Sequence, residues 1–360
     1  MEYIELSELC TPHTKNIAVK DVANQKGKYP VFGAAGLVGF MDSYQMPNEY
    51  VGIIKDGAGI GRTNTYPAKS SLIGTMQCLL PKDGVNVKYL MYLVRSLKLG
   101  SSYSGATIPH IYYKNYKNTK IPKRELKQQL EIANILDNIE QGIKVKQEQL
   151  KALDELIQSR FTEMFGTLDM SKASDDWQSL GLLAKIHTGT TPSTTNADNW
   201  NGDILWITPA EIKSDSYYIY DTTRKITKQG QLSKSLTIMP RDTVLLSTRA
   251  PIGKVGIVGK PMACNQGFKN FECGKKLNPI FLYVLLKYNT TYLNSLGTGT
   301  TFKEISKSNV EKIKIPVPCV EKQNQFAEFV QQVEKAKEIV KIQIKDLQEL
   351  LALKMDEYFK

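Results

Sequence analysis

Two long stretches of the chain carry apolar residues at alternating steps of three and four. The first runs from Glu125 to Phe165, with no proline and only one glycine, Gly142, and the second runs from Glu321 to Phe359. This spacing places the apolar residues on one face of an amphipathic helix and continues as a heptad seam. At 1.5 Å per residue, each helix of about 40 residues would span roughly 60 Å.

Neither helix can bury its seam alone, so we expect the two to pair as an antiparallel coiled coil. Charged residues interrupt the seams at Lys146, Arg160, Lys337 and Lys354. The alternative is that each helix packs only against the domain that precedes it.

The rest of the chain mixes short strand-like runs with turns rich in Gly, Asn and Pro. Alternating or continuous apolar runs predict strands at residues 50–55, 243–248 and 254–259. The segments at residues 86–97 and 278–289 have helical periodicity. The pattern therefore predicts an α+β fold.

One phrase occurs twice. "SGATIPHI" at residues 104–111 matches "TGTTFKEI" at residues 298–305, and the same offset continues without gaps to the end of each long helix. Upstream the likeness is thin, although Ile60-Gly61 can be set against Ile252-Gly253. Two units are too few for a solenoid. The chain is therefore expected to hold two domains related by pseudo-twofold symmetry, each with a variable N-terminal part and a better preserved C-terminal part.

Prolines ahead of each long helix mark the domain edges, because proline is tolerated at a helix start and forces the preceding residue to extend. They are Pro122, Pro316 and Pro318. The expected segments are a first domain at residues 1–122, a central helix at 123–165, a second domain at 166–316 and a C-terminal helix at 317–360.

The net charge of +11 is concentrated in the two domains. Residues 1–122 hold 14 Lys+Arg against 8 Asp+Glu, a net +6, and residues 166–316 hold 19 against 12, a net +7. Each helical segment has 7 against 8, a net −1. Two separated basic segments are expected of two polyanion-binding modules.

The five scattered cysteines form no CxxC pair, so neither a disulfide framework nor a zinc site is expected. No apolar run is long enough for a membrane span, and the N-terminus lacks a signal-peptide core. These features predict a soluble cytoplasmic protein with no membrane partner.

Catalytic and metal-binding motifs are not evident. The glycines of "DGAGIGR" lack the GxGxxG spacing, and "GKVGIVGKP" departs from the P-loop at its first glycine and at its final Ser/Thr. A nuclease-like set of Asp203, Glu211 and Lys213 can be drawn, but such combinations are common in a chain this charged. No Asn/Asp-Pro-Pro-aromatic cluster for a flipped base occurs. We expect no catalytic or metal residues in this chain.

The chain resembles the DNA-specificity subunits of type I restriction-modification systems. The resemblance rests on "KYPVFGAAGLVGFMDSY" at residues 28–44, on "HTGTTPSTTNADNWNGDILWITPAEI" at residues 187–212, and on the twin phrases, each followed by an Ile-Pro step and a long helix. The first half shows no counterpart of the "TGTTPS" to "WITPAEI" block, so the two domains are expected to read unrelated half-sites.

The resemblance implies a non-catalytic subunit with two target recognition domains, each reading half of a split double-stranded DNA target and held apart by two antiparallel helices. It implies docking of two methyltransferase subunits, with restriction subunits joining a larger complex. No cofactor is expected in this chain, and S-adenosylmethionine is expected in the methyltransferase. Alternatives are a coiled-coil protein-interaction adaptor and a DNA-binding protein without enzyme partners.

Lys and Arg side chains are expected to contact phosphates, and a few polar side chains to contact base edges. In the first domain the candidates are Lys55, Arg62, Thr107, His110, Tyr112 and Lys114. In the second domain they are Thr190, Thr191, Arg249, Lys254, Gln266, Lys269, Thr301 and Lys303.

Overall fold

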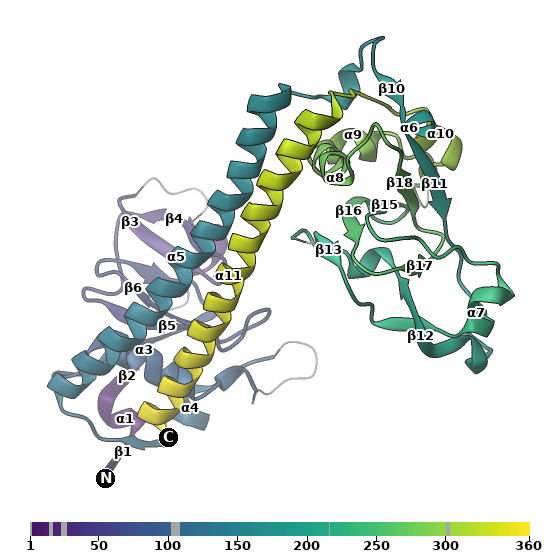
Figure 1. The fold of residues 1–360 in the computed structure, drawn as a ribbon. Coiled ribbons are helices and arrows are strands. Elements are labelled where there is room, and N and C mark those ends of the chain that lie inside the picture. The colour runs from purple at the N-terminus through teal and green to yellow at the C-terminus, as the bar shows by residue number, and fades with distance from the viewer. Residues whose placement is uncertain (1, 14–16, 23–26, 102–108, 216, 300–302) are drawn as a thin grey trace. The chain divides into compact units, whose positions relative to one another are not determined.

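The computed structural model describes residues 2–13, 17–22, 27–101, 109–215, 217–299 and 303–360. Its contacts divide the chain into a first unit, residues 1–150 with 339–360, and a second unit, residues 151–338. Figure 1 shows the two long helices, α5 (Leu126–Phe165) and α11 (Val320–Phe359). Each unit contains part of both helices, so the alternative in which each helix packs only on the domain before it is wrong.

Within the described residues, the first unit contains a four-stranded sheet, a three-stranded sheet and a short terminal ribbon. The four-stranded sheet has the order β2 (Cys10–His13), β8 (Met76–Pro81), β5 (Tyr50–Ile54), β6 (Thr63–Tyr66). The three-stranded sheet has the order β4 (Gly36–Met41), β3 (Tyr29–Gly33), β7 (Ser71–Leu72). In the ribbon, β1 (Tyr3–Glu5) pairs with β9 (Lys120–Pro122). The helices are α1 (Leu6–Leu9), α2 (Val19–Val22), α3 (Val87–Ser96) and α4 (Tyr113–Tyr116).

The second unit, over its described residues, has a five-stranded sheet, a three-stranded sheet and a matching ribbon. The five-stranded sheet has the order β11 (Ala184–Thr188), β18 (Lys269–Cys273), β15 (Val244–Thr248), β16 (Ile252–Val258), β13 (Tyr218–Ile219). The three-stranded sheet has the order β14 (Arg224–Ile226), β12 (Trp200–Ile207), β17 (Met262–Cys264). In the ribbon, β10 (Gln178–Ser179) pairs with β19 (Lys314–Ile315). The helices are α6 (Leu180–Leu183), α7 (Lys228–Ser233), α8 (Pro279–Tyr288), α9 (Thr290–Ser295) and α10 (Lys307–Glu311).

The two units share one strand plan. The order β2-β8-β5-β6 in the first unit corresponds to β11-β18-β15-β16 in the second. In the smaller sheets, β3 and β12 are both central strands with one antiparallel and one parallel neighbour. The first half therefore lacks the sequence of the block at residues 187–212 but shares the strand plan that this block belongs to. Strand order depends on apolar patterning and turns, which leave residue identity free to diverge.

The backbone at two glycines supports the alignment of Ile60-Gly61 with Ile252-Gly253. Gly61 precedes β6 with a φ of +83°, and Gly253 lies at the start of β16 with a φ of +90°. These backbone conformations strongly favour glycine. At Gly61 a Cβ atom would also lie 2.4 Å from the backbone nitrogen of Gly100.

A buried glutamine fastens each long helix to a shorter helix of the same unit. In the first unit, Gln129 Oε1 accepts from Asn86 N at 2.9 Å. In the second unit, Gln323 Oε1 accepts from Asn278 N at 2.8 Å, and its Nε2 donates to the Pro318 carbonyl at 2.8 Å. Asn86 and Asn278 cap the helices α3 and α8.

Replacing Gln323 with alanine is expected to lower the free energy of unfolding of the second unit by about 2 to 3 kcal/mol, because buried backbone groups lose their partners. Gln323 is 0% exposed. All three tryptophans of the chain, Trp177, Trp200 and Trp206, belong to the second unit. Urea denaturation followed by tryptophan fluorescence therefore measures this unit. The exposed Gln331→Ala on the same helix is the control, and an equal midpoint for the two variants would contradict the role of Gln323.

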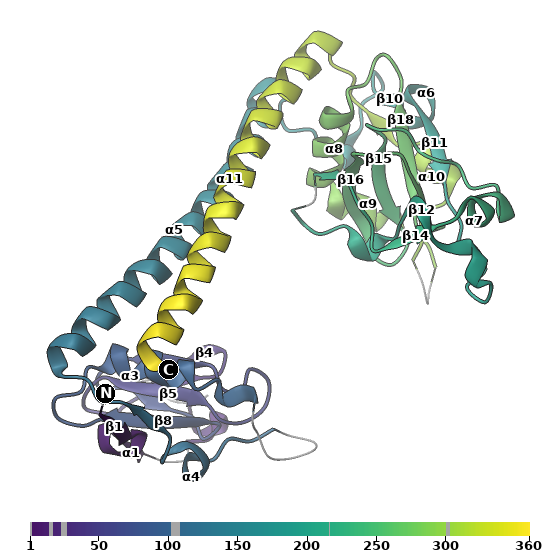
Figure 2. The same ribbon diagram turned by 60° about the horizontal axis from the view of Figure 1, so that its bottom comes forward.

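The helix seams are buried within each unit. In the first unit, Leu136 and Ile139 are buried and Phe359 packs on Tyr89 with ring centroids 5.4 Å apart. In the second unit, Phe161 and Phe326 meet edge-to-face at 5.3 Å. Within each unit the two helix segments run antiparallel and side by side, as Figure 2 also shows. Among the described residues, no helix combines the length and apolar character needed to cross a membrane.

Candidate nucleic-acid interface

In the second unit, predicted contact residues meet at the end of β15, where the repeated phrase crosses it. A cavity of about 440 Å³ opens there. Its lining includes Pro209, Arg249, Ala250, Asn265, Gly267 and Glu304. Arg249, Asn265 and Glu304 give this cavity both hydrogen-bond donors and acceptors.

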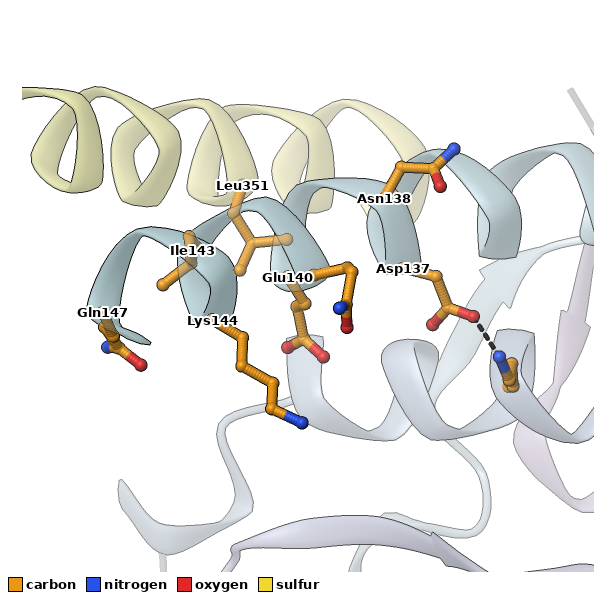
Figure 3. Close-up of a pocket in the computed structure, with 9 residues that line it drawn as sticks. Asp137, Asn138, Glu140, Ile143, Lys144, Gln147 and Leu351 are labelled. Atoms are coloured by element: carbon orange, nitrogen blue, oxygen red, sulfur yellow. Dashed lines mark hydrogen bonds and ion pairs between the residues drawn. The ribbon is translucent and has the colours of Figure 1, made fainter. Parts of the chain in front are cut away.

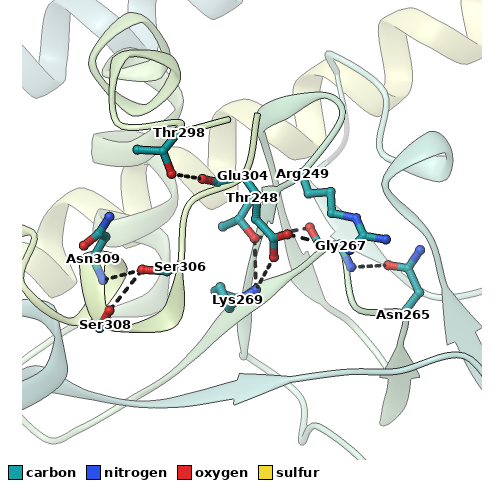
Figure 4. Close-up of polar contacts among 10 residues, drawn as sticks. All are labelled: Thr248, Arg249, Asn265, Gly267, Lys269, Thr298, Glu304, Ser306, Ser308 and Asn309. Atoms are coloured by element: carbon teal, nitrogen blue, oxygen red, sulfur yellow. Dashed lines mark hydrogen bonds and ion pairs between the residues drawn. The ribbon is translucent and has the colours of Figure 1, made fainter. Parts of the chain in front are cut away.

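Glu304 is the centre of this cluster (Figure 4). Arg249 Nη1 lies 3.6 Å from Glu304 Oε2, and Lys269 Nζ lies 3.3 Å from Oε1. Lys269 Nζ also contacts Thr248 Oγ1 at 3.5 Å. The Glu304 backbone is held by paired hydrogen bonds with Thr298 of 3.0 and 3.1 Å. The carboxylate is thus fixed between an exposed arginine and a buried lysine.

The surroundings of Lys269 differ from those of a surface phosphate contact. Its side chain is 9% exposed, and its ammonium faces Glu304. The contact with DNA stays a prediction, and the geometry favours a role in holding Glu304.

Of the other predicted residues of the second unit, Gln266 and Lys254 are tied to residues that line this cavity. Thr191 Oγ1 donates to Gln266 Oε1 at 2.8 Å, and Gln266 neighbours two of the cavity residues in sequence. Lys254 Nζ donates to the Pro209 carbonyl at 3.0 Å. Thr190 accepts a hydrogen bond from Trp206 Nε1 through its carbonyl at 3.2 Å. Lys303 is exposed, and Thr301 lies outside the described residues.

In the first unit, four candidates gather beside the end of β5. His110 Nδ1 forms a hydrogen bond with the Asp56 carboxylate, and the His110 ring centroid lies 3.9 Å from that of Tyr112. Lys114 Nζ lies 5.3 Å from the Tyr112 ring centroid. The Lys55 carbonyl accepts a hydrogen bond from Ile111 N at 3.0 Å. An exposed aromatic ring beside a lysine is suited to contact with nucleic acid.

The two remaining candidates of the first unit are Arg62 and Thr107. Arg62 is exposed, and its Nε donates to the Gly59 carbonyl at 3.3 Å within its own turn. Thr107 lies outside the described residues.

Sequence reasoning missed the acidic partners, Asp56 and Glu304, and the amide of Asn265. Carboxylates are not among the side chains that usually contact DNA phosphates, so Asp56 and Glu304 do not stand out in the sequence. A signal was present, because the repeated phrases align His110 with Glu304.

A groove of about 610 Å³ in the first unit offers a different surface (Figure 3). It runs along α5 beside Lys88 of α3, with Leu351 of α11 contributing. Tyr92 Oη donates to Asp137 at 2.8 Å and to Glu140 at 3.0 Å. Burial, together with these carboxylates, raises the pKa of the Tyr92 phenol. The acids of this groove are engaged by neighbouring donors and have a structural role.

The described residues contain no group of three or more His, Cys, Asp or Glu side chains that could hold a metal ion. In the nuclease-like set, the Glu211 carboxylate accepts from Thr208 N at 2.8 Å and from Thr223 N at 2.6 Å. Its role is therefore to cap the turn that begins at Thr208.

Comparison with known proteins gives a consistent family match. The model of the type I restriction modification DNA specificity domain matches residues 1–155 and 174–349. The type I restriction enzyme MjaIX specificity subunit of Methanocaldococcus jannaschii is 36% identical over 177 residues, 48% of this chain and 41% of that relative. The chain thus spans less than half of that relative in the match. The EcoR124I/EcoR124II specificity subunit of Escherichia coli is 23% identical over 295 residues, 74% of this chain and 67% of the relative.

Solved structures agree in fold. The S subunit of a type I restriction-modification system from M. genitalium aligns over 100% of this chain and 96% of its own, with a TM-score of 0.62 and 15% identity. A chain from a study of assembly and conformational transition of the type I R-M system aligns over 99% and 97%, with a TM-score of 0.60 and 17% identity. The predicted α+β fold with two long helices is confirmed.

Proposed function

We propose that this chain, which belongs to the type I restriction modification DNA specificity family, is the DNA-reading subunit of such a system. Its recognition domains lie at residues 1–122 and 166–316, and each reads one half of a split double-stranded target. The helical segments at 123–165 and 317–360 set the gap between the half-sites. The chain itself catalyses nothing. It directs a methyltransferase subunit that binds S-adenosylmethionine, and restriction subunits join where the host encodes them.

The duplicated strand plan is the observation that carries this proposal. Two units with the same strand order each bring basic and polar side chains to the end of an equivalent strand, β5 or β15. A duplicated reader suits a target with two half-sites. An adaptor for acidic proteins would share the basic charge but would not need two such positions.

Selection from a random-sequence duplex DNA library tests the proposal. The full chain, in complex with its methyltransferase partner, is expected to enrich two short conserved blocks separated by a constant gap. Each block is read by a separate unit, so substitutions in one unit are expected to change one block only. Sequencing of the enriched DNA checks this.

A salt titration provides the control. The logarithm of the affinity for the enriched DNA is expected to fall with the logarithm of salt concentration, with a slope of about −0.9 per phosphate contacted. Enrichment of no motif, or an affinity indifferent to salt, would instead favour the adaptor.

A further inference from the structure

The structure places two residue pairs at the same position of the duplicated fold. An isolated antiparallel bridge joins Asp56 to His110 in the first unit, and another joins Arg249 to Glu304 in the second. Each pair links a residue just after an equivalent strand to the matched residue of the repeated phrase. Asp56 lies two residues after the end of β5, and Arg249 lies one residue after the end of β15.

Backbone hydrogen bonds confirm the equivalence. Ile111 N donates to the Lys55 carbonyl at 3.0 Å, and Ile305 N donates to the Thr248 carbonyl at 2.9 Å. In both units the crossing segment is therefore fastened to the strand end in the same register.

The polarity of the two pairs is reversed. In the first unit the strand end carries the acid, Asp56, and the phrase carries His110. In the second unit the strand end carries the cation, Arg249, and the phrase carries Glu304. The strands next to β5 and β15 also differ in charge. Gln77 of β8 and Lys269 of β18 occupy corresponding positions, and only Lys269 carries a charge.

The ion pair of Arg249 with Glu304 contributes little to the stability of the loop. The side chains of Arg249 and Glu304 are 43% and 38% exposed. Ion pairs between such exposed side chains contribute little to stability. The reversal therefore matters for the charge that the strand-end side chain presents to a ligand.

A common phosphate contact does not fit the reversal, because a carboxylate at the strand end repels phosphate. Base edges present both donors and acceptors in the major groove. An arginine donates to O6 and N7 of guanine, whereas an aspartate accepts from the amino group of cytosine.

We infer that the strand-end residue of each unit reads one base, with Arg249 donating to a guanine in one half-site and Asp56 accepting from a cytosine in the other. Glu304 and His110 are positioning residues that hold these side chains, and Lys269 holds Glu304. The inference rests on the proposed function. It deepens that function by assigning one base contact in each half-site.

Library selection with single variants of the full chain in its complex tests the inference. Arg249→Gln is expected to reduce the preference for one guanine in one block by roughly 5- to 150-fold, the value of a bidentate contact. Glu304→Gln is expected to relax the same base pair, because Arg249 loses its support. Asp56→Asn is expected to relax one cytosine in the other block and leave the first block unchanged.

The control is Arg241→Gln, a change of a 60% exposed arginine of the second unit outside the cluster. It is expected to leave both blocks unchanged. A wild-type complex that enriches no motif would overturn the proposed function itself. A wild-type motif that Arg249→Gln leaves unchanged, or weakens evenly at all positions, would overturn the base assignment alone.

Discussion

Replacing Lys337 with alanine is expected to lower the free energy of unfolding of the second unit by about 3 to 5 kcal/mol. Lys337 lies in the seam of α11 and is 2% exposed. Its Nζ donates to Glu334 Oε1 at 2.7 Å and to Asp154 Oδ1 of α5 at 2.9 Å. Glu334 is also buried, so removal of the ammonium leaves a carboxylate without its principal partner in the interior. Tryptophan fluorescence during urea denaturation measures the loss.

Charge, rather than volume, is expected to account for the effect. The exposed Lys335→Ala on the same helix should change stability by less than about 0.5 kcal/mol. A double variant, Lys337→Met with Glu334→Leu, removes both buried charges and should recover most of the lost stability. A double variant as unstable as Lys337→Ala would show that packing is responsible.

The pH dependence of the same contact follows from its pKa. Burial opposes the charge of Lys337, but the hydrogen bonds with Glu334 and Asp154 outweigh it and raise the pKa of the ammonium. A raised pKa in the folded state means that the contribution is complete below the unfolded value and is lost as pH rises through the folded value. The difference between the wild type and Lys337→Ala should therefore persist up to about pH 10.5 and shrink only above it.

The long helices could be predicted almost to the residue, because apolar periodicity over about 40 residues is a strong signal. The charged residues that interrupt the apolar seams of these helices were informative too. Lys337 was recognised as an interruption of the seam, but its role required the position of Asp154, which lies far away in the sequence. At the break at Arg160 the seam continues through Phe161, which lies four residues after Ile157 and three before Met164 and is buried.

The C-terminal part of each domain could be predicted from repeated residues, whereas the N-terminal part could not. The strands β3 and β12 occupy corresponding places with unrelated sequences, YPVFG and WNGDILWI. Pairing partners along the sheet fix such a strand, and no local signal reveals them. The reversed pairs at the strand ends could not be predicted for a related reason. A repeat is recognised by similar residues, and these equivalent positions carry dissimilar ones.

Under the proposed function, this reversal lets one duplicated fold carry two readers of different half-sites. The backbone bridge is the same in both units, so the strand end and the repeated phrase meet although the acid lies on opposite sides of the two pairs. Exchange of the acid and the cation alters the hydrogen-bonding pattern offered to a ligand without altering the scaffold. Divergence of the two half-sites then requires no change of fold.

Truncation of Phe326 to alanine is expected to be as damaging as loss of Lys337, at about 3 to 5 kcal/mol. Phe326 is 0% exposed, and its ring meets Phe161 at 5.3 Å and Phe165 at 5.5 Å. Phe281 of α8 contacts the same two rings of α5 at 5.7 and 4.9 Å. This aromatic cluster joins both long helices to the fold of the second unit, so a cavity here weakens their attachment.

Controls for Phe326→Ala separate the loss of packing from a general effect of truncating an apolar side chain. Phe326→Leu keeps much of the apolar volume and should cost less than half as much. Leu156→Ala, on the exposed side of α5, should change stability by less than about 0.5 kcal/mol, because Leu156 is 46% exposed. Each variant is measured by urea denaturation with tryptophan fluorescence. If Phe326→Ala and Leu156→Ala were equally mild, the cluster would not be what attaches the helices to this unit.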